Sequence, residues 1–459
     1  MNDCRSCADF SRSTLLRAAA GQGLPAIEPG MPSPAGTGLS RRTFLSRSAG
    51  LALAVYGLDK LSFGALEEGI ASAASGPAGR VLVSIFLQGG TDALSLLYPA
   101  GDATYTKLRP TLALPASAGP AFAEDTRLHW HPSLSPIAKL HAEGKVAVMP
   151  SIGYEHADQS HFTSRHYWEV GATDARLTTG WLGRYLDTIG TQDNPLQGLS
   201  LDGSLSPTLA TTNVPVAAVD GASYNFWTNH VWGKVENRFY DSLREISATA
   251  STKTGARGAA GDVALQSLRL REQMKPFEPQ DNKPAFTSPV AYPTSNDNFP
   301  KQLAGLAAML GAGLPLTCVA LEGPGSYDTH SDQADALTTG IDLAAKSLLA
   351  FQRDLEARGL QDRVVVHVWT EFGRRAEENG SKGTDHGAAG TGFLIGSRVN
   401  GKLIGEFAGL PGGLDKDGNL RATADYRAVY SALLEQWFQT DAGAIIPGAS
   451  AFARPTLIR

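Results

Sequence analysis

Four apolar segments of strand length recur along the chain, and a helix-like stretch precedes three of them. They lie at residues 80–90 ("RVLVSIFLQGG"), 144–154 ("GKVAVMPSIGY"), 314–323 ("LPLTCVALEG") and 363–373 ("RVVVHVWTEFG"). Their apolarity is continuous rather than alternating, which is typical of strands covered on both faces. Alternating strands and helices predict an α/β fold, with a mostly parallel central sheet and helices on both faces.

Acidic residues and histidines follow these segments closely. In an open α/β sheet the carboxyl ends of the strands border the ligand site, so these side chains are expected to converge there. Carboxylates suit hard divalent cations, and imidazoles suit zinc. The pattern predicts a site for one or two divalent ions, zinc or calcium, magnesium or manganese. The expected ligands are Asp92, Asp328, His330, Glu371, Asp385 and His386.

Each of these positions also has a simpler interpretation. A single aspartate after a strand often caps a helix, and a single histidine is often a hydrogen-bonded structural residue. The metal prediction therefore depends on several Asp/Glu–His groups occurring at strand ends of one chain. Arg374 is a candidate for binding substrate phosphate, although a charged helix start or an ion pair with Glu377 or Glu378 would explain it equally well.

The N-terminal region contains an export-like segment. Residues 40–58, "SRRTFLSRSAGLALAVYGL", place Arg41 and Arg42 before an apolar run that is too short for a comfortable membrane span. Small residues at 71–73 suit a signal peptidase. The segment resembles a twin-arginine signal, which implies a signal region over residues 1–73, the twin-arginine translocase as partner, and a periplasmic, extracellular or cell-envelope location. An amphipathic or uncleaved anchoring helix remains the alternative.

Residues 80–459 are expected to form one domain, with an irregular insertion or lid at about 220–299. The chain has 40 Lys and Arg against 45 Asp and Glu, so no basic field points to nucleic acid. A G-x-x-x-x-G-K-[ST] loop is absent from the sequence, which argues against nucleotide binding. The aromatic group Tyr224, Phe226, Trp227 and Trp232 would serve either to stack on sugars or to fill the core.

Several longer motifs carry a family resemblance. In chain order they are "GGTDALSLLYP", "YTKLRPTLAL", "HPSLSPIAKLHAEGKVAVMPSIGY", "SHFTSRHYWEVG", "GWLGRYLD", "YDTHSDQ", "TEFGRR" and "DHG". Together they resemble the DUF1501 family of exported proteins of unknown function, which is similar in fold to the alkaline phosphatase and sulfatase superfamily. The resemblance extends from about residue 80 to the C-terminus and implies an alkaline phosphatase-like fold.

The same resemblance implies a metal-dependent hydrolase of phosphate or sulfate esters, acting on a small-molecule or glycan ester. Asp92 and Glu371 would hold one ion, and Asp328, His330 and His386 a second. Ser160 or Thr163 would be the nucleophile, with His161 as a ligand or acid. Arg165 and His166 would bind an anionic substrate oxygen.

The sequence also departs from the superfamily pattern. Phe372 stands where alkaline phosphatases have a histidine, and the acid before it is Glu371 rather than Asp. Ser160 lies in "DQSHF", which is not a sulfatase formylglycine context. A non-catalytic metal- or ligand-binding envelope protein on a phosphatase-like scaffold is therefore the alternative function. A serine esterase is disfavoured because the chain lacks a G-x-S-x-G elbow.

Overall fold

The structure is a computed structural model that describes residues 54–56, 79–221, 233–277 and 286–459. Most of the export-like segment, including both arginines and residues 71–73, lies outside the described residues. The aromatic group at 224–232 also lies outside them.

A nine-stranded sheet forms the centre of the described chain. Its order is β1 (Ala54–Tyr56), β7 (Val216–Ala218), β6 (Gly198–Ser200), β8 (Cys318–Glu322), β2 (Val81–Phe86), β9 (Val364–Trp369), β12 (Gly390–Ile395), β5 (Val146–Gly153) and β13 (Ala424–Asp425). Five neighbouring pairs are parallel, and the pairs β1–β7, β9–β12 and β12–β5 are antiparallel. The predicted α/β class with a mostly parallel sheet is confirmed, and all four predicted strands belong to the sheet.

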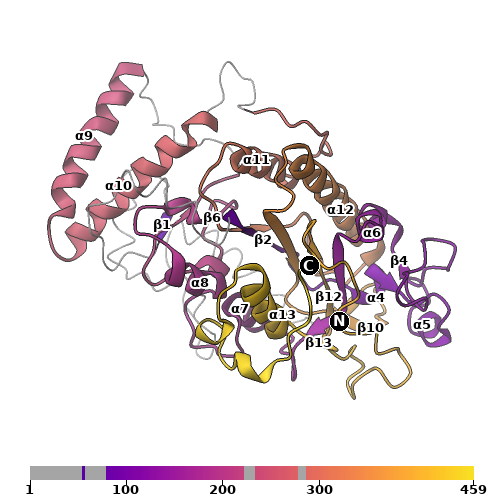
Figure 1. Ribbon diagram of the computed structural model, residues 1–459. Coiled ribbons are helices and arrows are strands. Elements are labelled where there is room, and N and C mark those ends of the chain that lie inside the picture. Colours follow the sequence, from indigo (N-terminus) through magenta and orange to yellow (C-terminus); the bar gives the residue numbers. More distant parts are fainter. Residues whose placement is uncertain (1–53, 57–78, 222–232, 278–285) are drawn as a thin grey trace.

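Helices cover both faces of the sheet (Figure 1). Alternate strand residues point to opposite faces, and apolar side chains on both faces pack against these helices. Val83 of β2 packs into one core with α6 (Ser135–Ala142), α11 (Phe299–Gly311) and α12 (Gln333–Ala357). Leu82 packs into the other core with α7 (His161–Val170), α8 (Trp181–Ile189) and α13 (Tyr426–Ala432). Burial on both sides explains why every residue of β2 and β9 is buried.

The region expected to be an irregular insertion contains a helical hairpin in its described part. It consists of α9 (Gly233–Ser251) and α10 (Ala256–Met274). Figure 1 shows α9 on the outer side of α10, away from the sheet. No helix in the described ranges combines the length and apolarity needed to cross a membrane.

The remaining elements are short. They are α4 (Ala93–Leu96), β3 (Leu97–Tyr98), α5 (Ala103–Leu108), β4 (His129–Trp130), β10 (Arg374–Glu378), β11 (Thr384–His386), a π-helical turn (Leu433–Trp437), and 3₁₀ turns at Pro132–Leu134, Pro195–Gln197, Pro207–Leu209, Lys275–Phe277, Ala442–Ala444 and Ala449–Ala451. Arg374 begins the strand β10, so the helix-start interpretation of this residue is wrong.

Candidate metal centre

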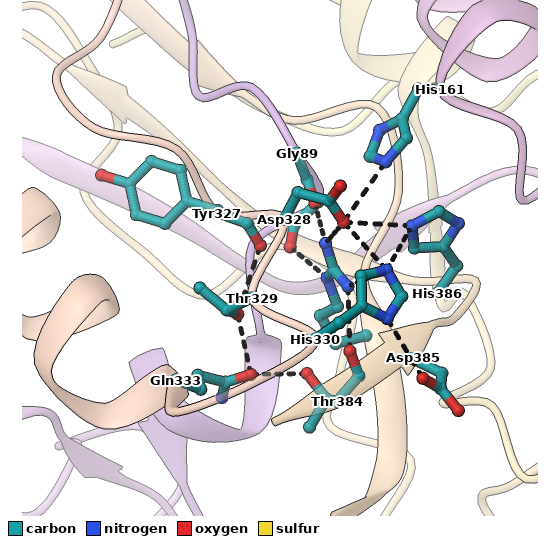
Figure 2. Close-up of polar contacts among 12 residues, drawn as sticks. Gly89, His161, Tyr327, Asp328, Thr329, His330, Gln333, Thr384, Asp385 and His386 are labelled. Atoms are coloured by element: carbon teal, nitrogen blue, oxygen red, sulfur yellow. Dashed lines mark hydrogen bonds and ion pairs between the residues drawn. The ribbon is translucent and has the colours of Figure 1, made fainter. Parts of the chain in front are cut away.

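Three histidines surround one carboxylate oxygen beyond the carboxyl ends of β8 and β9. The Nε2 atoms of His161, His330 and His386 lie 3.4, 3.0 and 3.2 Å from Asp328 Oδ1. His330 Nε2 also lies 3.0 Å from His386 Nε2. Figure 2 shows the three rings pointing at Asp328 from separate elements: His161 begins α7, His330 follows β8, and His386 ends β11.

The other nitrogen of each ring faces a hydrogen-bond acceptor. His161 Nδ1 is 2.7 Å from Glu371 Oε1, and His330 Nδ1 is 3.1 Å from Asp385 Oδ1. His386 Nδ1 is 2.8 Å from the backbone oxygen of Gln159. An acceptor at Nδ1 keeps a proton on that nitrogen, so Nε2, which faces the shared centre, is the nitrogen of each ring that would bind a metal ion. Histidines that bind metals are oriented in this way.

The spacing of these donors fits a metal ion. Ligands 2.0–2.1 Å from a tetrahedral zinc ion lie about 3.3 Å from one another. Four of the six separations among these four donor atoms are 3.0–3.4 Å, close to that edge length. Within the described residues, ligand atoms of His161, Asp328 and His386 lie within 4.8 Å of one another, and His330 adds a further nitrogen. Three imidazoles and one carboxylate are a donor set that zinc accepts.

The charges of the group are strongly coupled. Burial would raise the pKa of Asp328, but its contacts with the three histidines and Arg374 lower the pKa far below its usual value. Burial would lower the pKa of His161, but Asp328 and Glu371 outweigh it and raise the pKa to about 9. Burial lowers the pKa of His386. A cation at this centre therefore finds an ionised carboxylate.

Glu371, two residues after the end of β9, contacts the Nδ1 atom of His161 and is not one of the groups around Asp328 Oδ1. Its carboxylate accepts the backbone N–H groups of Gly89 at 2.9 Å and Gly90 at 3.1 Å. Burial would raise the pKa of Glu371, but the hydrogen bond and charge of His161 outweigh it and lower the pKa. Gly89 has φ +105°, and a Cβ on it would lie 2.3 Å from the backbone nitrogen of Asp328. The strand-end carboxylate thus orients one histidine, and the glycine permits the close approach.

The structure does not bring Asp92 into the group of Nε2 atoms. Its carboxylate accepts Leu94 N at 3.2 Å as the cap of α4, and it forms a fully buried ion pair with Arg109. Ser95 Oγ donates to it at 2.7 Å and Gln333 Nε2 at 2.6 Å. The helix-cap interpretation describes this residue, and both of its oxygens have other donors.

Arg109 and Gln333 were not singled out in the sequence. Arg109 lies in a loop-like "KLRP" segment, and Gln333 follows a histidine motif without any charge of its own. Gln333 Oε1 accepts from Thr329 Oγ1 and Thr384 Oγ1 (Figure 2), so it connects the loop of Asp328 to β11. A lone amide carries no sequence signal for such a role.

Arg374 lies beside the centre, but it has many partners. Its guanidinium donates to Asp328 Oδ1 at 2.6 Å, to Thr384 O at 2.9 Å, and to the backbone oxygens of Gly89 and Gly90. Its side chain is fully buried. These contacts suit a residue that positions Asp328, and its role in substrate binding stays a prediction.

The other candidates lie along α7. Ser160 occupies the N-cap position and Thr163 the first turn, and both are half-buried. Arg165 forms ion pairs with Glu169 at 2.7 Å and Glu322 at 3.0 Å. Ser160 and Thr163 thus share the end of α7 that carries His161, whereas Arg165 is held by other acids.

Two aromatic or imidazole side chains complete the surroundings. His166 is buried, and its Nε2 atom lies 3.3 Å from the backbone oxygen of Asp174, which is not part of the metal centre. The ring of Phe372 lies 4.8 Å from that of His161 and 4.8 Å from that of His386. The residue that departs from the superfamily pattern therefore forms an apolar wall of the centre.

Comparisons with solved structures return distant likenesses. They include a protein in the alkaline phosphatase superfamily from Vibrio parahaemolyticus (8% identity, 86% of this chain and 80% of that chain, TM-score 0.33). The zinc complex of the C-terminal periplasmic domain of EcEptC from Escherichia coli is similar at 8% identity (78% and 81%, TM-score 0.35). The PsFucS1 sulfatase from Pseudoalteromonas sp. is similar at 11% identity (87% and 78%, TM-score 0.31). With TM-scores below 0.5, these likenesses do not bear on the activity of this chain.

A search of curated proteins finds no match to this chain. A family model described as a protein of unknown function, DUF1501, matches residues 160–444, which is more than half of the chain. The matched stretch contains His161, Asp328, Glu371 and His386. The chain therefore belongs to the DUF1501 family.

Proposed function

We propose that this chain is an exported metal-dependent hydrolase of phosphate or sulfate esters. The observation that carries the proposal is the convergence of three imidazole Nε2 atoms on Asp328 Oδ1, with an acceptor at each Nδ1. One ion, best matched by zinc, fits this donor set. A calcium, magnesium or manganese site would draw on more oxygen ligands.

His161, Asp328, His330 and His386 would hold the ion. A bound divalent ion supplies Lewis-acid polarisation of an ester oxygen and a lowered pKa of bound water. Glu371, Asp385 and the Gln159 carbonyl would fix the orientation of the imidazoles and raise their basicity, which strengthens metal binding.

Solvent reaches the metal centre on the side of His330 and Asp385, and not on the side of His161. The side chain of His161 is fully buried, whereas that of His330 is 27% exposed and that of Asp385 is 56% exposed. A small-molecule or glycan ester would approach from the His330 side. Ser160, next to His161 in the chain, is the proposed nucleophile, with Thr163 as the second choice.

One arrangement favours the alternative function, a non-catalytic metal- or ligand-binding envelope protein. The apolar ring of Phe372 packs on two of the histidines, and the guanidinium of Arg374 already contacts Asp328. Both features reduce the polar surface that a reacting anion would meet. A site built in this way would bind an ion and catalyse nothing.

Metal analysis of the purified protein, joined to hydrolysis of p-nitrophenyl phosphate and p-nitrophenyl sulfate, separates the two functions. The proposal expects bound metal, turnover, loss of both in His386→Ala, and loss of turnover in Ser160→Ala. His156→Ala is the matched control, because His156 is exposed at the surface. Metal-free wild-type protein contradicts the hydrolase and a metal-binding role, and bound metal without turnover across a broad ester panel supports the non-catalytic function.

Export through the twin-arginine pathway is part of the proposal and has its own test. Replacing Arg41 and Arg42 together with lysine is expected to retain the protein in the cytoplasm of a host that has this translocase. Export of the double variant at the wild-type level would contradict the assignment of the signal.

A further inference from the structure

One helix carries all of the large apolar side chains that are exposed within the described ranges. Val235, Phe239 and Ile246 are 65%, 42% and 67% exposed, and all three lie on α9. Spacings of four and seven residues put them on one stripe of the helix. An aligned stripe differs from the scattered apolar residues that any surface contains, which makes it a candidate interaction surface.

This stripe is separate from the face that binds α10. Tyr240 and Ser247 are the buried residues of α9, and Arg271 of α10 lies over the Tyr240 ring at 3.7 Å. Ion pairs of Arg244 with Glu272 and of Arg271 with Glu236 join the two helices further. The hairpin therefore closes without using the stripe.

A row of exposed charges runs beside the stripe. The same face of α9 also includes Ser242, between Phe239 and Ile246. The residue just before each of these four positions is charged and exposed: Lys234, Arg238, Asp241 and Glu245. The N-terminal half of the row is basic and the C-terminal half is acidic. The charge of the row therefore changes from positive to negative at its midpoint.

We propose that the stripe of α9 binds the α9 stripe of a second copy of this chain, with the two helices antiparallel. In that orientation Val235 packs beside Ile246 of the partner copy, and Phe239 beside Ser242 of the partner copy. Arg238 then approaches Glu245 of the partner copy, and the reciprocal pair forms by symmetry. In a parallel two-fold pair the two rows would lie on opposite sides of the contact and would not meet, so only the antiparallel pair brings their opposite charges together.

Such a contact is self-complementary, as a two-fold dimer interface must be. The 19 residues of α9 span about 28 Å, which limits the interface to one helix face and makes it a modest one. The stripe lies on α9, which contributes no residue to the metal centre. The inference is independent of the proposed hydrolase activity.

Sedimentation velocity of the full-length protein over a concentration series tests the proposal. We expect a reversible dimer in the wild type. Arg238→Glu alone, or Glu245→Arg alone, creates two like-charge contacts per dimer and is expected to raise the dimer dissociation constant at least about tenfold. The double variant Arg238→Glu/Glu245→Arg restores opposite charges and is expected to return to within about threefold of the wild type.

Two further variants complete the design. Phe239→Ser is expected to weaken the dimer, and Lys416→Glu, the same charge change on an exposed loop residue, is expected to leave it intact. Circular dichroism confirms that each variant keeps its helix content. A wild type that is monomeric throughout, or a double variant as weak as the single ones, overturns the proposal. A monomer that binds phosphatidylglycerol vesicles and loses this in Phe239→Ser overturns it too.

Discussion

The buried ion pair between Asp92 and Arg109 provides a decisive test of what Asp92 does. Both side chains are fully buried, and Arg109 also donates to the backbone oxygens of Ala376 at 2.9 Å and Arg375 at 3.0 Å. Arg109→Met would leave a carboxylate without its counter-charge and two carbonyls without a donor. Removing one partner of a buried pair costs about 3–5 kcal/mol. We expect a loss of that size in the free energy of unfolding.

The pH dependence of that loss has a definite sign. Burial by itself raises the pKa of Asp92, and the charge and hydrogen bonds of Arg109 outweigh it and lower the pKa below the ordinary value of 3.8. Without Arg109, burial dominates and the folded state favours the protonated acid. The variant then loses stability as the pH rises above about 4, so its deficit relative to the wild type is larger at about pH 7 than at about pH 5.

Urea unfolding followed by tryptophan fluorescence at both pH values measures these quantities. Arg127→Met is the matched control: Arg127 pairs with Asp125, but its side chain is 57% exposed, and such pairs contribute about 0.2–1 kcal/mol. A deficit for Arg109→Met no larger than that of the control would refute the reasoning. Asp92→Asn is expected to keep the bound metal, and metal loss in a folded Asp92→Asn protein would make Asp92 a ligand after all.

Three other expectations concern neighbouring groups. Glu371→Gln removes the charge behind His161 and should weaken zinc binding about 10–100-fold in competition with a chelating dye; unchanged affinity would argue against the orienting role. Gly89→Ala should destabilise the protein more than Gly313→Ala, because both have positive φ but only Gly89 meets backbone atoms; equal losses in thermal unfolding would contradict this. Burial raises the pKa of Asp202 to about 7, so the wild type should lose stability relative to Asp202→Asn as the pH rises from about 4 through 7; parallel curves would refute it.

The sequence by itself determined the strands and the side chains that follow them. β2 and β9 were predictable because six consecutive residues, apolar except for Ser84 and His367, are typical of a strand buried on both faces. Residue chemistry likewise singled out Asp328, His330 and His386 as candidate ligands, and the family resemblance implied that His161 is a ligand or acid. These features are local, since a short window of sequence contains all the information they require.

Only the tertiary structure decided which partner each candidate side chain contacts. Asp92 and Glu371 were expected to share an ion, yet Asp92 pairs with Arg109, and Glu371 orients His161 across 210 residues of chain. The antiparallel course of β12 between β9 and β5 was equally invisible in the sequence. A carboxylate binds whichever donor folding brings within about 3 Å, and sequence spacing holds no record of distances across the fold.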